Sequence, residues 1–188
     1  MQNMKTIAAG IILCCRFFTA QAQSQPDSVI AKEHALHFAD SFVKANFYQD
    51  WKTYIALTTP SAIQYYGGKK GYEEHVTNLY FRNEPQLEEK PETVYMVNLA
   101  NNDMDEWQCI IRKVRSTRIE YRKAKLHTFL IGKSTDNGET WTFVDVSHNS
   151  IENIIYIMPG IFDTLAIPER KTTYDDESAG TQTSAMNN

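Results

Sequence analysis

Apolar residues in the first part of the chain recur every three or four positions, which is the spacing of one face of an α-helix. The repeat runs from about Val29 to Asn46 and predicts one long helix. Its apolar face consists of Ala31, Ala35, Leu36, Phe38, Ala39, Phe42 and Val43.

Cap and turn residues divide the next segment into shorter helices. Asp50 can cap a short helix, because its carboxylate can accept hydrogen bonds from the free N–H groups of a first turn. Pro60 restarts the chain at a favoured first helical position, and Gly67 and Gly68 stop it. A third helix is expected from about Lys70 to Phe81.

The period changes from helical to alternating after Pro91, which predicts strands. The strand segments are residues 93–99, 107–112, 126–131 and 140–146, and Ile119 and Tyr121 continue the strand character between them. A short helix is expected to begin near Ile151 and to end at Pro159 and Gly160. Helices followed by antiparallel strands predict an α+β fold, in which N-terminal helices pack on a curved antiparallel sheet and a short C-terminal helix follows.

The first 22 residues have the pattern of a secretory signal peptide. Lys5 precedes a short apolar run from Ile7 to Leu13, and Ala20 and Ala22 form a small-x-small cleavage site. The run is shorter than the roughly 20 apolar residues that span a bilayer. We therefore expect an exported protein, periplasmic or extracellular, with no transmembrane segment after cleavage. Its single domain would cover residues 23–170, and a polar, acidic and disordered tail residues 171–188.

Charge and cysteine content narrow the function classes. The whole chain has 19 basic and 23 acidic residues, a formal charge of −4. Lys5 and Arg16 leave with the signal segment, so the processed chain is more acidic, which argues against general affinity for nucleic acid. Cys109 is the one cysteine after the signal segment, so no intramolecular disulfide can form. The apolar residues that alternate around Cys109 favour a buried, inert thiol, and the alternative is a nucleophile.

A turn motif precedes the last predicted strand. Ser134, Asp136, Gly138 and Trp141 fit the Asp-box pattern S-x-D-x-G-x-x-W. The aspartate can accept N–H bonds across the turn, the glycine can adopt positive φ, and the tryptophan can cover the turn. The motif predicts a rigid structural hairpin rather than a catalytic site.

Residues 112–125 form a basic run. It contains seven cations and one acid, Glu120. The cations are Arg112, Lys113, Arg115, Arg118, Arg122, Lys123 and Lys125. One interpretation is a solvated sheet face or edge. The other is an anion-binding surface, centred on Arg112, Arg118 and Arg122, for an acidic glycan, a lipid headgroup or an acidic partner.

Tyrosines are frequent for this length. Those in or near elements that could line a cavity include Tyr54, Tyr66, Tyr72, Tyr80 and Tyr95. An apolar ring with a polar tip suits a ligand pocket, and it equally suits a half-buried core rim.

Other polar clusters do not predict a metal site or a cofactor. Glu33, His34 and His37 share one side of the first helix. The acidic residues Asp103, Asp105 and Glu106 lie in a turn, and both groups are interpreted as solvated surface. Motifs of serine hydrolases, zinc hydrolases, P-loop proteins and dinucleotide-binding proteins are absent from the sequence. No catalytic residue is identified.

Two resemblances rest on these features. The element order over about Val29 to Ser147 resembles the nuclear-transport-factor-2-like or cystatin-like fold, which implies a cone-shaped cavity. Four segments resemble a group of small exported bacterial proteins of uncharacterised activity, which implies a shared fold. They are Tyr66 to Lys69, Ser134 to Asp145, Ile154 to Pro159 and Leu165 to Pro168.

Three hypotheses about function follow. The favoured one is an exported non-catalytic module that binds a small molecule or a partner, such as an envelope protein, through a concave sheet face. The second is a small isomerase or hydrolase with a buried carboxylate or histidine and tyrosine donors. The third is an interaction protein without a cavity. Titratable groups that converge inside one cavity would favour the enzyme.

Overall fold

The structure is a computed structural model, and it describes residues 24–82, 90–102, 104–147 and 151–175. The helices come first: α2 (Ser24–Phe47), α3 (Trp51–Ala56), α4 (Pro60–Tyr65) and α5 (Gly68–Arg82). The strands β1 (Thr93–Asn101), β2 (Trp107–Ile119), β3 (Arg122–Ser134) and β4 (Thr142–Asp145) follow, and then α6 (Ile151–Ile157) and β5 (Lys171–Tyr174). The expected signal segment, its cleavage site, Asp103 and the chain after Asp175 lie outside the described residues.

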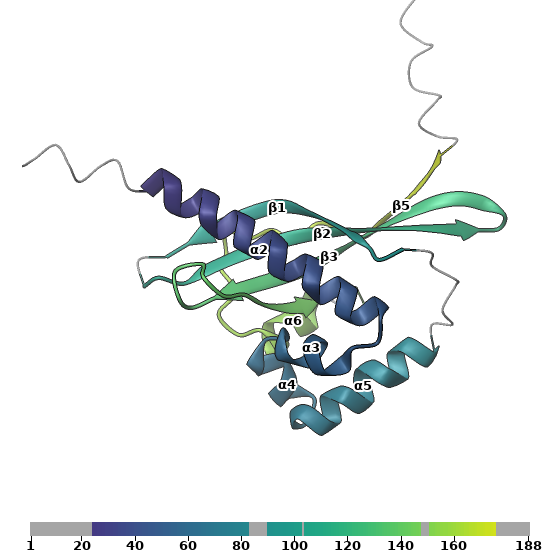
Figure 1. Cartoon of the computed structure of the whole chain (residues 1–188), viewed down its shortest axis with the longest axis horizontal. Coiled ribbons are helices and arrows are strands. Elements are labelled where there is room, and N and C mark those ends of the chain that lie inside the picture. The colour runs from purple at the N-terminus through teal and green to yellow at the C-terminus, as the bar shows by residue number, and fades with distance from the viewer. Residues whose placement is uncertain (1–23, 83–89, 103, 148–150, 176–188) are drawn as a thin grey trace, which may run out of the picture.

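The strands form one curved antiparallel sheet, so the predicted α+β architecture is confirmed (Figure 1). The strand order is β1-β2-β3-β4. β5 pairs with residues 124–127 of β3, and β4 pairs with residues 130–133 of the same strand. The α3–α4 connection runs beside β4, where Phe143 N donates to Leu57 O and Thr59 N donates to Phe143 O.

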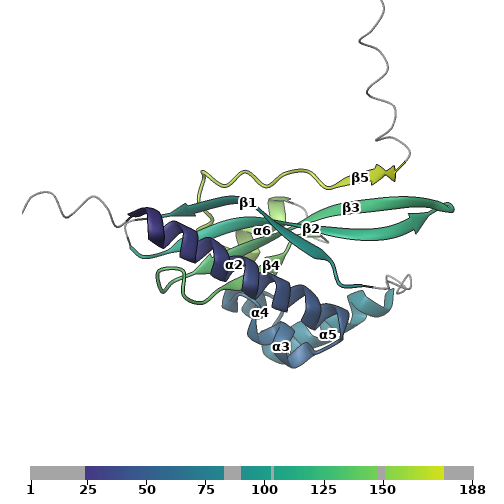
Figure 2. The same cartoon turned by 45° about the horizontal axis from the view of Figure 1, so that its top comes forward.

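The predicted long helix is α2, and it lies along one face of the sheet (Figure 2). Ala31, Ala35 and Ala39 are spaced by four residues and are at most 1% exposed. Their small side chains share one face of the helix and let its backbone approach the strands closely. Further along, the Phe42 ring stacks on Tyr54 with ring centroids 4.3 Å apart and contacts Phe143. Asp50 caps α3 as predicted, because its side chain accepts from Thr53 N at 3.1 Å.

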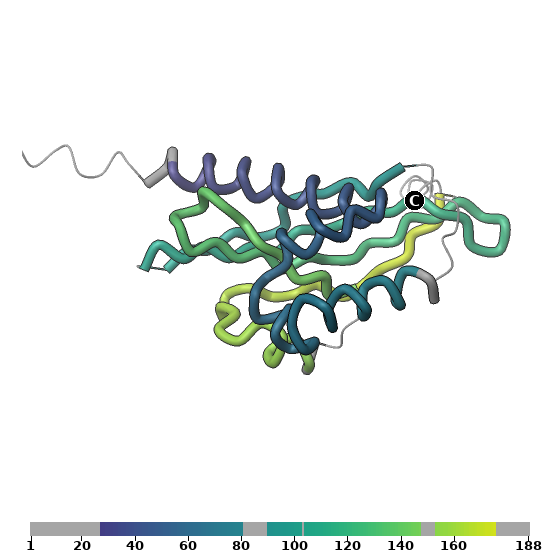
Figure 3. The backbone as a smooth tube through the Cα atoms, turned by 60° about the horizontal axis from the view of Figure 1, so that its bottom comes forward, coloured from purple at the N-terminus to yellow at the C-terminus, as the bar shows by residue number. Residues whose placement is uncertain are grey.

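The opposite face of the sheet is covered as well. Ile110, Phe129 and Ile131 are buried there against Ile154 and Ile157 of α6. Figure 3 shows α2 on one side of the central strands and the chain after β4 on the other. Burial on both faces explains why β2 begins with consecutive buried residues instead of a strict alternation.

The β3–β4 turn has the geometry that its motif predicts. Ser134 Oγ donates to Asp136 Oδ1 at 2.7 Å, and that oxygen also accepts from Thr140 N at 3.0 Å. Gly138 has φ +84°, and its carbonyl accepts from the indole N–H of the buried Trp141 at 3.0 Å. The turn therefore forms a closed hydrogen-bonded unit.

The same turn packs against the first half of α2. A Cβ on Gly138 would lie 2.6 Å from the Cβ of Ala31, so a glycine is required by both space and backbone angle. His34 Nδ1 lies 3.1 Å from Gly138 O, which leaves His34 half-buried at this contact.

Two sequence predictions need correction. The strand segment predicted over residues 107–112 runs on to Ile119, and Tyr121, predicted to continue the strand character, lies in the turn between β2 and β3. The exposed end of this hairpin carries charges on both faces, so its sequence lacks the alternation of apolar and polar residues that a half-buried strand shows. Residues 171–174, expected to begin a disordered tail, form β5, because Thr172, Thr173 and Tyr174 favour strands and the edge of β3 is open beside them.

We predict that Gly138→Ala lowers the free energy of unfolding by about 2 kcal/mol more than Gly160→Ala. Both glycines have φ above +80°, but a Cβ on Gly160 would meet open space whereas one on Gly138 would overlap Ala31. Chemical denaturation of the two variants measures the difference. Equal losses would show that the turn does not pack closely on α2.

Candidate functional site

Four charged side chains meet between the helices and the sheet. Lys113 Nζ, on the α2-facing side of β2, lies 2.6 Å from Asp145 Oδ2 and 3.0 Å from Glu92 Oε2. Arg115 Nε lies 3.3 Å from the other oxygen of Glu92. The Lys113 side chain is 3% exposed and that of Glu92 is 7% exposed. We call Lys113, Glu92 and Asp145 the buried ionic cluster; the Arg115 side chain, at its edge, is 36% exposed.

The charges of this cluster stabilise one another. Burial alone would lower the pKa of Lys113, but Asp145 and Glu92 raise it above its ordinary 10.5. Burial would raise the pKa of Asp145, but the Lys113 charge and hydrogen bonds from Lys113 and Ser147 lower it below its ordinary 3.8. The Lys113 contribution to stability is therefore full below pH 10.5 and is lost as the pH rises through its raised pKa. The Asp145 contribution is full above pH 3.8 and is lost as the pH falls through its lowered pKa.

Three of the five predicted ligand tyrosines lie together beside this cluster. Tyr54 and Tyr72 are buried and their rings stack, and Tyr66 contacts Tyr72 with ring centroids 5.7 Å apart. Burial raises the pKa of Tyr54, and Tyr72, Asp145 and Glu92 raise it further. Burial also raises the pKa of Tyr72 to about 12. Both hydroxyls stay protonated at neutral pH.

The other two tyrosines lie apart from that group. Tyr80 is half-buried, packs edge-on against Trp51 and accepts from Gln49 Nε2 at 3.0 Å. Tyr95 is 45% exposed on the opposite face of the sheet, where Arg112 lies 5.2 Å from its ring centroid. The five tyrosines therefore do not line one common pocket.

The basic run also divides into separate environments. Lys113 belongs to the buried ionic cluster, Arg115 lies at the edge of that cluster, and Arg112 is half-buried beside Tyr95. Arg118 is exposed and lies directly opposite Lys123 in the strand register. Arg122 is exposed and its guanidinium lies 4.3 Å from the centroid of the Tyr174 ring. We call residues 115–125, where the hairpin continues beyond the end of β1, the basic arm.

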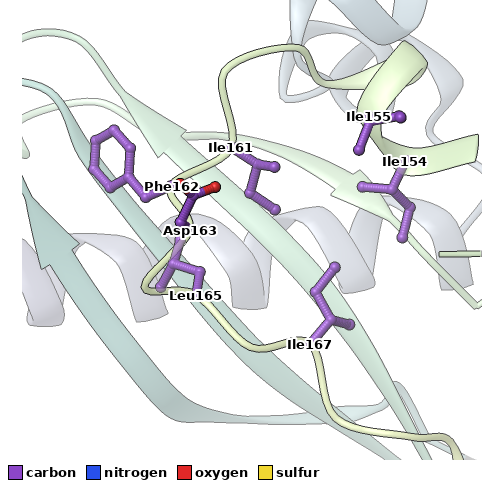
Figure 4. A pocket seen from close by; sticks show the side chains of 7 residues that line it. All are labelled: Ile154, Ile155, Ile161, Phe162, Asp163, Leu165 and Ile167. Carbon is purple, nitrogen blue, oxygen red and sulfur yellow. The ribbon is translucent and has the colours of Figure 1, made fainter. Parts of the chain in front are cut away.

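An apolar groove that was not predicted from the sequence lies on the other side of the sheet (Figure 4). Ile154 and Ile155 of α6 face Ile161, Leu165 and Ile167 of the following segment across a volume of about 220 Å³. The dense apolar pattern of residues 151–167 was the available signal. Because the lining is apolar apart from Asp163, the groove offers mainly apolar contact area.

The sequence pattern did not reveal the buried ionic cluster either. Lys113 was grouped with the solvent-facing cations, although alternation places it on the same face as Cys109 and Ile111. Asp145 lies between two buried valines, Val144 and Val146. Charged residues within such apolar patterns were the available signal, but their pairing depends on contacts between distant strands.

The cysteine and the polar clusters show no reactive or metal-binding arrangement within the described part of the chain. Cys109 is fully buried, and burial raises the pKa of its thiol, which keeps it protonated. Among the described residues, no group of three or more His, Cys, Asp or Glu side chains could hold a metal ion. Within those residues no helix is both long and apolar enough to cross a membrane.

We predict that Lys113→Met lowers the free energy of unfolding at pH 7 by about 3 kcal/mol or more, because it leaves two buried carboxylates without their cation. The matched control is Lys44→Met, which breaks an equally short but exposed pair with Asp40 and should cost at most about 0.5 kcal/mol. Denaturant titration measures both. A small loss in Lys113→Met would mean that water solvates the cluster.

Comparison with known proteins identifies no relative. No protein-family model matches the chain, and no significant match was found among curated proteins or solved structures.

Proposed function

We propose that this chain is an exported, non-catalytic module that binds an anionic partner through its basic arm. The proposal rests on the contrast between a buried cation that is paired with carboxylates and exposed cations that are not. The inward cation Lys113 is paired with Glu92 and Asp145 and is almost inaccessible to solvent. The basic arm has five cations and one acid, and Arg118 and Lys123 point into solvent.

The arm is a better candidate than the tyrosine-rich concave face. α2 packs into that face, and Tyr54 and Tyr72 are each 5% exposed. A ligand that reached their hydroxyls would have to displace core side chains. Cations on an otherwise acidic chain instead attract anions without any rearrangement.

We propose further that the fold is nuclear-transport-factor-2-like or cystatin-like. A long N-terminal helix on the inner face of an antiparallel sheet in the order β1-β2-β3-β4 supports this assignment. Fold alone implies no activity, since such scaffolds host many functions.

A cavity-type enzyme is the second candidate. It is favoured by the convergence of Lys113, Glu92 and Asp145 on Tyr54, together with Thr128, whose buried hydroxyl has no hydrogen-bond partner among the described residues. Against it, the ionic groups are already neutralised by each other, which leaves no free base or acid poised near neutral pH.

We predict that the processed protein binds a soluble sulfated glycan with an affinity that falls about tenfold or more between about 50 and 200 mM salt. The double variant Arg118→Glu, Lys123→Glu should lose most of this binding. The matched control, Lys69→Glu with Lys70→Glu, makes the same change in net charge at exposed positions of α5 and should bind like the wild type. Salt-independent binding, or equal losses in the two variants, would contradict the role of the arm.

We predict that the exported protein begins at Gln23, because Ala20 and Ala22 form the cleavage site after the apolar run. Intact-mass spectrometry of protein recovered outside the cytoplasm measures the N-terminus. A chain that retains Met1, or that is acylated at Cys14 or Cys15, would contradict a soluble exported module.

A further inference from the structure

We infer that the basic arm docks onto an anionic lipid surface, with Tyr121 at its tip entering the headgroup layer. The inference rests on the proposed function and names its partner. It follows from three independent features: the projection of the arm, the two like charges of Arg118 and Lys123 that face each other on it, and the turn at its tip.

The arm projects beyond the rest of the sheet (Figures 1 and 2). β1 pairs with β2 only as far as Val114, and the pairing of β5 with β3 ends at Ala124. The five residues of β2 beyond Val114 correspond to about 17 Å of extended chain. Near its tip the arm is therefore a two-stranded ribbon that can reach a flat surface before the body of the domain does.

The charges on the arm repel one another. Arg118 and Lys123 are direct partners in the antiparallel register, so their side chains share one face of the ribbon, and like charges in that position are destabilising. Lys125 lies on the same face, opposite Ser116, and its amine is 3.8 Å from Asp175. No described residue forms an ion pair with Arg118 or Lys123. An anionic surface would relieve this repulsion.

The tip carries an unusual turn. Glu120 and Tyr121 connect Ile119 to Arg122 with φ values of +49° and +67°. A two-residue turn with both φ values positive favours Asn-Gly, and a bulky residue in the left-handed region is an outlier. Tyr121 is nevertheless there and is fully exposed. The free-energy cost of this backbone conformation is explained if the Tyr121 ring contacts the partner directly.

A lipid surface fits this arrangement better than a soluble acidic polymer. Tyrosine is amphipathic and is enriched where membranes meet water. Each Lys or Arg near an anionic leaflet adds attraction to it. The Tyr121 ring lies at the tip of the arm and the cations lie behind it on both strands. This arrangement suits an arm whose tip meets a flat surface first. Glu120 opposes this attraction, and Arg115 and Lys125 are paired with Glu92 and Asp175. Arg118 and Lys123 have no ion-pair partner among the described residues.

The test is co-sedimentation of the exported, processed protein with vesicles of zwitterionic lipid, with or without about one third of anionic lipid. We expect binding to the anionic vesicles alone. Tyr121→Gly should weaken that binding about fivefold or more, while its melting temperature stays at or above the wild-type value, because glycine accepts the positive φ. Tyr156→Ala removes another exposed tyrosine, on α6, and should bind like the wild type.

A second variant reports on the ring directly. Tyr121→Trp should show a blue shift in its added fluorescence when anionic vesicles are present and none with zwitterionic vesicles. Unchanged binding by Tyr121→Gly together with no blue shift would overturn the inference and leave the proposed function intact. Binding to the sulfated glycan but not to vesicles would have the same consequence. Failure to bind either anion would overturn the proposed function as well.

Discussion

The pairing of one buried lysine is the constraint that organises this molecule. A lysine ammonium taken out of water is costly unless anions compensate it. Lys113 meets that requirement through Glu92, which directly precedes β1, and Asp145, the last residue of β4. Its two ionic contacts therefore tie the centre of the sheet to the start of one strand and the end of another, at the place where α3 and α5 bring their tyrosines.

Small residues allow close packing on one side of the sheet, and large apolar side chains cover the other side. The alanines of α2 let that helix lie close to the strands, and Gly138 lets the β3–β4 turn contact the same helix. Isoleucines of α6 cover the opposite face. With both faces covered, the centre of the hairpin is held firmly, so its far end can extend into solvent as an ordered arm.

This division separates stability from recognition. Inside, cations and carboxylates are matched, and their role is to hold strands together. Outside, Arg118 and Lys123 face each other without a described counter-ion, and Tyr121 occupies a backbone conformation that glycine would adopt more easily. Exposed features that lower stability, such as the facing cations and the strained tyrosine, need a functional explanation. The matched ion pairs of the interior are explained by stability alone.

The sequence by itself determined the local structure: the face of α2, the cap at Asp50, the restart at Pro60 and the turn at Gly138. Each depends on neighbours within a few residues, so its physical cause is visible in the chain. The tertiary structure decided the rest. Lys113 finds its partners 21 and 32 residues away in sequence, and β5 pairs across more than 40 residues. The arm exists because β1 stops short of it and β5 pairs only with its base, at Ala124 and Lys125. Such contacts depend on strand register, which an alternating pattern does not specify where both faces are exposed.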